Sequence, residues 1–308
     1  MSPLGNRFLN FSWIIKATKL LAHHKDSFKF STKLNRCLRH FFKACLIVWL
    51  YLSSTEVSSQ TNNSERSVWD LGIGLTHFNI PDYNGSDNIT TITTPFPYIV
   101  YTGKLFRVKD GSVQSVLFSS ERLYLGLSGD GTPPVSSDKN TVRSQMPNLD
   151  PVLELGPSLE YYLSISNNRQ SLLFLELPLR TAIATDLKST QHIGWVTNPR
   201  IKYHFQHGKW RFRLGAGPGF ANNNYYQYYY GVSPEFETQT RPAYEAKSGF
   251  GGMHYTSGFG WRHKNIYLGG YVRYIDLSNA VFEPSPLVER NHSLLSGVSI
   301  AWIFNSRQ

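Results

Sequence analysis

The sequence predicts an all-β protein: a closed antiparallel transmembrane β-barrel of about 12 strands, with 10 to 14 as the range, preceded by a signal peptide. Three observations support this fold class. The body of the chain alternates apolar and polar residues with period 2. Aromatic residues make up 14% of the chain and charged residues only 17%, and the mean hydropathy is −0.31. A transmembrane barrel gives this mixture, because every second strand residue faces lipid and the others face a polar interior.

Residues 1–59 are expected to be a long n-region and a cleavable signal peptide, with the barrel in residues 60–308. Residues 33–43 are basic, and residues 44–52 form an apolar run that is too short to span a bilayer as a helix. Val57-Ser58-Ser59 then supplies small residues for cleavage before Gln60. A retained membrane anchor is the alternative reading of the same segment.

The net charge of +10 does not indicate a nucleic-acid partner. Residues 1–60 carry nine Lys and Arg against two acidic residues, so the leader holds +7 of the total. The rest of the chain is nearly balanced, which removes the argument for a polyanion partner. Both cysteines, Cys37 and Cys45, also lie in the leader. Disulfides and thiolate metal sites are therefore excluded from the body.

Apolar residues of one parity recur along the body and predict the strands. Segments of about 10 residues fit a strand that crosses the hydrocarbon layer at a tilt. The last segment is rich in aromatic residues, as expected for barrel assembly, and residues 305–308 follow it. The apolar rows fall in residues 69–75, 123–127, 153–163, 173–179, 210–216, 266–274 and 294–304.

Charged residues of the opposite parity are predicted to face the barrel lumen. They could line a conducting pore, or they could pair across a narrow lumen and close it. A paired network is favoured, because unpaired charges in a small lumen are costly. The residues are Glu154, Glu160, Glu176, Arg180, Arg213 and Arg273.

Several sequence blocks, taken in order, resemble the MipA/OmpV family of MltA-interacting outer-membrane proteins. They cover most of residues 68–304. The most specific block is Ala-Asn-Asn-Asn-Tyr-Tyr-Gln-Tyr-Tyr-Tyr-Gly-Val at residues 221–232. The other blocks are residues 81–87 (PDYNGSD), 95–98 (PFPY), 146–151 (MPNLDP) after Arg143, 154–159 (ELGPSL), 241–244 (RPAY) and 284–288 (PSPLV).

The resemblance implies a non-catalytic barrel in the outer membrane of a Gram-negative bacterium, with membrane lipid around it. Members of the family are associated with scaffolding that brings a lytic transglycosylase and a murein synthase together. Others are described as porin-like channels for small polar solutes or as adhesins. A scaffold predicts a closed lumen and a partner footprint on the periplasmic side. A channel predicts that substitutions at Arg213 and Glu176 alter ion selectivity, and an adhesin would use outer loops such as residues 128–148.

Two groups of residues are candidate recognition sites, each with a plainer alternative. The turn at Pro81, Asp82, Tyr83, Gly85 and Asp87 could contact a partner or a cation, but Pro, Asn, Gly and Asp are also the residues that tight turns require, and turn chemistry is favoured.

The second group is a tyrosine cluster, which could stack on a sugar or a protein partner. It could instead belong to the interfacial aromatic girdle, although its members occupy both strand parities, so some must face the lumen or a loop. The cluster is Tyr225, Tyr226, Tyr228, Tyr229 and Tyr230.

No enzymatic motif supports a catalytic function. The body contains neither a G-x-S-x-G nucleophile elbow nor an HExxH zinc motif. We therefore expect no catalytic residues, no metal and no cofactor.

Overall fold

The computed structural model describes residues 68–102, 106–109, 112–168, 170–186 and 188–306. The predicted signal peptide lies outside the described residues. The described chain is almost entirely β-structure, with one α-helix, α3 (Asn223–Tyr230). The strands are β1 (Val68–Pro81), β2 (Ile89–Thr102), β3 (Phe106–Lys109), β4 (Ser112–Ser119), β5 (Leu123–Thr132), β6 (Val152–Ile165), β7 (Ser171–Pro178), β8 (Arg180–Thr185), β9 (Thr190–Thr197), β10 (Arg200–His207), β11 (Trp210–Ala221), β12 (Gly249–His263), β13 (Ile266–Asp276) and β14 (His292–Ser306).

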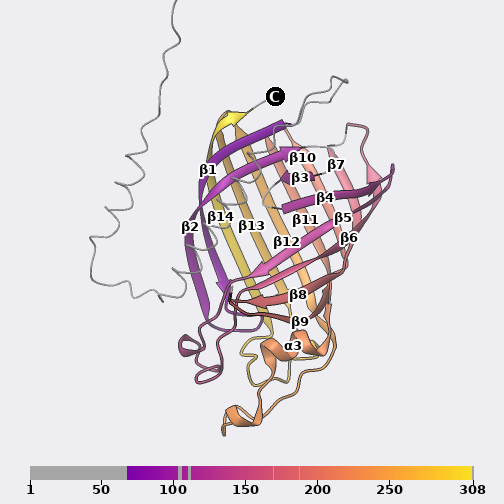
Figure 1. Cartoon of the computed structure of the whole chain (residues 1–308). Coiled ribbons are helices and arrows are strands. Elements are labelled where there is room, and N and C mark those ends of the chain that lie inside the picture. The colour runs from indigo at the N-terminus through magenta and orange to yellow at the C-terminus, as the bar shows by residue number, and fades with distance from the viewer. Residues whose placement is uncertain (1–67, 103–105, 110–111, 169, 187, 307–308) are drawn as a thin grey trace, which may run out of the picture. The chain divides into compact units, whose positions relative to one another are not determined.

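The strands pair in a ring of antiparallel neighbours. Most strands pair with the next along the chain, the exceptions being β7 with β8 and β9 with β10, and β14 pairs with both β13 and β1, so the first and last strands are joined. Figure 1 shows the strands tilted around a common axis. None of the described helices is long and apolar enough to cross a membrane.

The fourteen strands of the described chain occupy twelve positions around this ring. β7 and β8 lie end to end along β6, which pairs with both of them. β9 and β10 likewise lie end to end along β11. The predicted number of about twelve is therefore confirmed when each of these pairs is counted as one interrupted strand.

Glycines opposite the two interruptions make room for the displaced backbone. A Cβ on Gly156 would lie 2.0 Å from the carbonyl oxygen of Leu179, between β7 and β8. A Cβ on Gly217 would lie 1.9 Å from the carbonyl oxygen of Pro199, between β9 and β10. Both distances are far shorter than any real contact, so these strand breaks require glycine on the neighbouring strand.

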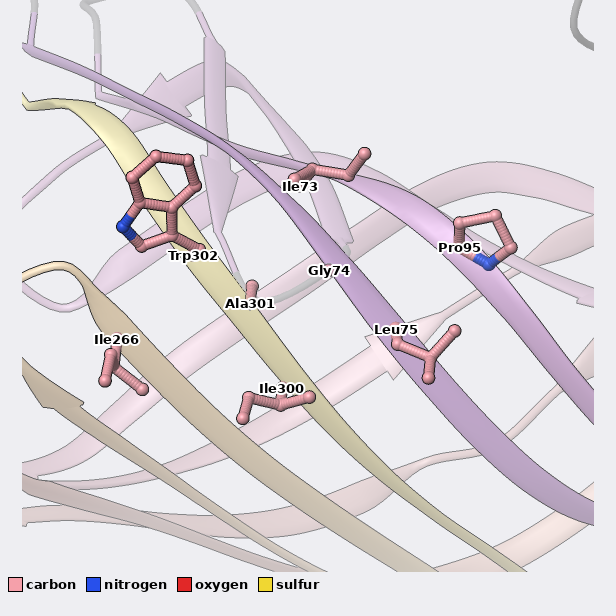
Figure 2. A pocket seen from close by; sticks show the side chains of 8 residues that line it. All are labelled: Ile73, Gly74, Leu75, Pro95, Ile266, Ile300, Ala301 and Trp302. Atoms are coloured by element: carbon pink, nitrogen blue, oxygen red, sulfur yellow. The ribbon is translucent and has the colours of Figure 1, made fainter. Parts of the chain in front are cut away.

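The predicted alternation is confirmed by the exposure of the side chains. Leu75, Leu153, Leu177, Leu214 and Ile300 all point outward and are exposed, although they are large and apolar. On a soluble protein such a surface would be costly, whereas in a bilayer it meets lipid. Figure 2 shows part of this outward face along β1 and β14, where Ile73, Leu75, Ile300 and Trp302 flank a shallow apolar groove.

The two ends of the barrel differ in the length of their connections. The C-terminal end of β14 lies at the end with short turns, such as Gly208–Lys209 and Lys264–Asn265. The opposite end carries the long loops and α3 (Figure 1). Transmembrane barrels of the outer membrane keep short turns on the periplasmic side and long loops outside, so the end with α3 is the outer end.

Placing a charge on the lipid-facing surface should destabilise the barrel. Ile300 lies within β14 and is 52% exposed. We expect Ile300→Arg to lower the free energy of unfolding by about 2–4 kcal/mol, because the guanidinium would enter hydrocarbon. Urea unfolding in lipid vesicles measures this loss, with Ile300→Leu as the control. Equal stability of the two variants would show that this face does not meet lipid.

Candidate functional site

Four loops at the outer end pack into one unit, which we call the loop cap: residues 82–88, 133–151, 222–248 and 277–291. Its interior is apolar and aromatic, and contains Tyr83, Met146, Tyr230, Phe282 and Leu287, all buried. The loops are far apart in sequence, yet most of the family-like blocks fall within them. The cap therefore brings residues 81–87, 146–151, 221–232, 241–244 and 284–288 to one place.

The tyrosine cluster lies on α3, within the cap. Asn222 precedes the helix, and its side chain accepts a hydrogen bond from the backbone N–H of Tyr225, which fixes the helix start. Tyr226, Tyr229 and Tyr230 are buried. The ring of Tyr230 stacks on Phe282 with centroids 3.8 Å apart. The cluster therefore lies in a loop and not in the aromatic girdle, which is one of the two locations that the sequence left open. Most of its ring surface packs inside the protein. Its role in recognition stays a prediction.

Two arginines connect the loops of the cap through backbone carbonyls. Arg143, which is buried, donates to the carbonyl oxygen of Tyr229 at 2.9 Å, and its guanidinium lies 5.8 Å from the centre of the Tyr83 ring. Arg241 donates to the carbonyl oxygens of Val142 and Ser144 at 2.8 and 2.9 Å. Charged donors on carbonyl oxygens make strong hydrogen bonds, so these two side chains hold the cap together.

The candidate turn at residues 81–87 is also part of the cap. Gly85 has a φ of +88°, in the region that favours glycine. The Tyr83 hydroxyl donates to the carbonyl oxygen of Leu287 at 2.9 Å, Asp82 accepts from Asn140 at 2.9 Å, and Asp87 forms an ion pair with Arg290. These contacts agree with turn chemistry, and they engage both carboxylates with protein partners.

Below the cap, an ion-pair group bridges the lumen. Arg180 contacts Glu154 at 3.2 Å and Asp130 at 3.6 Å. Arg273 of β13 reaches the same Asp130 of β5 at 3.2 Å. β5 and β13 lie six positions apart in a ring of twelve, so this ion pair crosses the lumen from one wall to the opposite wall.

This upper group is also joined to the cap. The Tyr225 hydroxyl donates to Glu154 at 2.9 Å, so α3 is anchored directly to the lumen carboxylate. Tyr229 and Thr132 share a second hydrogen bond of 3.1 Å between the helix and the end of β5. The cap and the ion-pair group therefore form one continuous hydrogen-bonded unit.

A second charged group lies further along the lumen, toward the periplasmic end. Glu160 and Glu176 are direct cross-strand neighbours on β6 and β7. Glu176 accepts from Arg200 at 3.0 Å and from Lys202 at 2.8 Å, and Glu160 accepts from the Tyr162 hydroxyl at 3.0 Å. The two carboxylates stay together because two cations of β10 lie beside them.

The structure brings five of the six predicted lumen residues into these two groups. Glu154, Arg180 and Arg273 meet in the upper group, and Glu160 and Glu176 in the lower one. Arg213 lies on the inward face of β11, beside Gly258 of β12. A Cβ added to that glycine would be 3.9 Å from the Arg213 Nε atom.

Sequence reasoning missed three members of the network: Asp130, Arg200 and Lys202. Asp130 sits in Ser-Gly-Asp-Gly-Thr, a stretch that resembles a polar loop but forms the end of β5. Its parity, opposite to that of Leu123, Leu125 and Leu127, was the available signal. The rest of the supposed loop at residues 128–148 contributes buried residues such as Val135 and Asn140 to the cap.

A cavity of about 280 Å³ remains between the cap and the upper ion-pair group. Tyr225, Tyr226 and Phe282 line its cap side, and Asp130 and Arg273 line its other side. Within the described residues, no three His, Cys, Asp or Glu side chains gather as a metal site would need.

Fold and geometry together define the class of protein: an outer-membrane β-barrel whose lumen is crossed by ion pairs and whose outer end carries a loop cap. A family model described as MltA-interacting protein MipA matches residues 73–304. The chain belongs to this family, and it is a protein of the Gram-negative outer membrane. The sequence matches none of the curated proteins with which it was compared.

Several solved outer-membrane proteins are similar to the chain, at a low level. An outer-membrane channel of Pseudomonas putida F1 is 10% identical, with a TM-score of 0.36, over 81% of this chain and 100% of that one. The outer-membrane channel DcaP of Acinetobacter baumannii is 8% identical, with a TM-score of 0.35, over 80% and 100%. The outer-membrane protease OmpT of Escherichia coli is 7% identical, with a TM-score of 0.28, over 80% and 99%. Likeness at this level carries no argument about activity.

Removing the Arg143 side chain should loosen the loop cap and leave the barrel intact. Arg143→Met keeps the aliphatic stem but removes the hydrogen bonds to the carbonyl oxygens of Tyr229 and Pro147. Each such bond contributes about 1.5–3 kcal/mol, so cleavage of the 222–248 loop by chymotrypsin should accelerate about tenfold or more. Lys188→Met, an exposed change at the same end, is the control. Unchanged protection of the loop in Arg143→Met would contradict this role.

Alkaline pH should open the cap. Burial raises the pKa of Tyr83, Tyr226 and Tyr229 above the usual 10, and raises that of Tyr228 to about 12. Because the folded-state pKa values are raised, the stability of the cap is full below pH 10 and falls as the pH rises through the folded-state values. Absorbance of tyrosinate should therefore show a late titrating group that coincides with cap opening. A single titration near pH 10 would contradict the burial of these phenols.

Proposed function

We propose that this protein is a non-catalytic scaffold that holds a lytic transglycosylase and a murein synthase at the periplasmic face of the outer membrane. The description of its family, MltA-interacting protein, supports the first partner. The observation that carries the proposal is the filled lumen: the cap covers the outer end, and the ion pair between Asp130 and Arg273 crosses the interior. A barrel whose lumen is obstructed in this way is better suited to hold partner proteins at the membrane than to conduct solutes across it.

The periplasmic end offers a small, basic contact surface. Arg122, Lys209 and Lys264 are exposed in the short turns at this end, while Glu121 is an exposed carboxylate beside them. Positive charge on this rim would attract an acidic surface of a partner enzyme and steer its approach. The short turns leave little chain for a flexible binding loop, so we expect a rigid footprint on the rim.

A porin-like channel is the second candidate, and the composition of the lumen favours it. The inward side chains of the described strands include charged residues of both signs around a cavity of about 280 Å³. A small polar solute could occupy that cavity. Passage would require the ion pair between Asp130 and Arg273 to separate and the loop cap to open, at the cost of leaving charges unpaired.

Charge reversal on the rim tests the scaffold. We expect Arg122→Glu with Lys209→Glu to reduce copurification of the lytic transglycosylase about tenfold at low ionic strength, because attraction becomes repulsion. The matched control reverses two exposed cations at the outer end, Lys188→Glu with Lys247→Glu, and should leave copurification unchanged. Added salt should weaken the binding of the unmodified protein.

Two results would contradict the scaffold. One is failure of the unmodified, folded barrel to retain the transglycosylase in detergent. The other is loss of binding in the outer-end control alone, which would move the footprint to the loop cap.

A further inference from the structure

The wall of the barrel is incomplete between β2 and β5. Among the described residues, Ile89–Val100 of β2 pair with β1 alone, and Leu127–Thr132 of β5 pair with β6 alone. β3 reaches β2 only at Tyr101 and Thr102, and β4 reaches β5 only as far as Gly126. The unpaired stretch of β5 is its outer half, whereas that of β2 covers all of the strand except Tyr101 and Thr102 at its periplasmic end.

The length of the connecting chain imposes this gap. β2 has 14 residues and β5 has 10, whereas β3 has 4 and β4 has 8. Only residues 103–122 connect β2 to β5 along the sequence, and β3 and β4 both come from this segment. At about 3.3 Å per residue, two strands drawn from this segment cannot reach the outer ends of their neighbours.

The free side of β2 is built to remain unpaired. The carbonyl oxygens of Ile300 and Trp302 lie against Gly74 and Gly72, so the odd-numbered residues of β1 direct their backbone groups toward β14. The odd-numbered residues of β1 therefore make no backbone hydrogen bonds with β2. Their partners there, Pro95 and Pro97, direct their backbone to the side away from β1.

Proline at these two positions removes the N–H donors that an added strand would need. The carbonyl oxygen of Pro95 is satisfied within β2, because the Thr94 hydroxyl donates to it at 3.3 Å. Figure 2 shows Pro95 on the outward face of the barrel, beside Leu75 of β1. These features disfavour the capture of a partner strand and favour a lasting opening.

The interior along the β2 edge of this opening is apolar, in contrast to the β5 edge, which carries Asp130. Phe78 and Ile80 of β1 line the cavity beneath the cap, and Phe78 pairs with Ile92 of β2. Phe96 of β2 also points inward, because its ring lies against Gly74 of β1: a Cβ added to that glycine would be 2.5 Å from a ring carbon. The charged side chains lie on β5, β6, β7, β8, β10 and β13, and Asp130 of β5 stands at the other edge of the opening. Acyl chains that enter along β2 therefore meet apolar side chains, while the ion pairs of Asp130 lie at the β5 edge.

We propose that the outer half of the wall between β2 and β5 is a lateral opening that admits acyl chains of the surrounding lipid to the inner face of β2. The occupant is membrane lipid, because the opening lies between outward rows that include Leu75 and Leu127, both exposed to the hydrocarbon layer. Unpaired backbone groups at this depth are otherwise unsatisfied, and the prolines and the Thr94 hydroxyl reduce their number on β2. The inference is independent of whether the periplasmic rim binds cell-wall enzymes.

Quenching by brominated lipid tests the opening. Residues 60–308 contain no cysteine, so with Cys37 and Cys45 replaced by serine a single bimane label can be placed at Ser128→Cys, on the inner face of β5 beside the opening. The labelled protein is purified from outer membranes and reconstituted in vesicles of brominated phosphatidylcholine. We expect its fluorescence to fall about twofold relative to vesicles without bromine, because acyl chains reach the label.

The matched control carries the label at Thr256→Cys, on the inner face of β12, where the wall is complete. Its fluorescence should not change. A second reporter at Phe96→Cys, on β2, guards against a folding defect at Ser128, and gel mobility before and after heating verifies that each variant has folded. Equal quenching at Ser128 and Thr256, or none at both Ser128 and Phe96, would overturn the proposal.

Discussion

This structure depends on one constraint: backbone N–H and C=O groups inside the hydrocarbon layer must find hydrogen-bond partners within the protein. Water is absent from the bilayer interior, so each strand must find its hydrogen-bond partners on two neighbours, and among the described residues the ring of pairings meets this demand except between β2 and β5. Period-2 alternation follows from it, because a strand paired on both sides has only a lipid face and a lumen face. The interruptions at Leu179 and Pro199 survive because glycine on the adjacent strand receives the displaced carbonyl.

Once the ring is closed, the lumen must be either hydrated or filled, and here it is filled with groups that satisfy one another. Two pairs of neighbouring carboxylates, Asp130 with Glu154 and Glu160 with Glu176, would repel each other alone. Cations from other strands neutralise both pairs, and the Tyr225 hydroxyl joins the upper pair to the loop cap. Breaking one contact would leave a buried charge without its partner, which makes the filling cooperative. An interior held together in this way is consistent with the scaffold that we propose.

The sequence predicted the fold well because the lipid face leaves a strong local signal. Rows such as residues 298–304 stay apolar at every second position through much of a strand, and all four of these side chains are exposed, which would be costly on a soluble protein. It predicted five members of the lumen network for the same reason, since Glu154 or Arg180 interrupts an apolar row with the opposite parity. Asp130 escaped because the flanking glycines suggest a turn, and only the pairing of β5 with β6 shows that it faces inward.

The loop cap could not be derived from local patterns. Its contacts join segments far apart in sequence, such as the hydrogen bond from Arg143 to Tyr229 and the stacking of Tyr230 on Phe282. The tyrosines were ambiguous as strand residues because they occupy both parities, which a short helix explains. The gap beside β2 was equally hidden, although Pro95 and Pro97 were visible signs of an edge strand.

We infer that the loop cap and the ion pair between Asp130 and Arg273 close the folded barrel to solutes. Single-channel recording in a planar bilayer tests it most directly, with gel mobility before and after heating to confirm that the inserted protein is folded. The structure predicts silence from folded protein under an applied voltage. Steady, well-resolved conductance steps would contradict the closed lumen and establish the charged side chains as the lining of a pore.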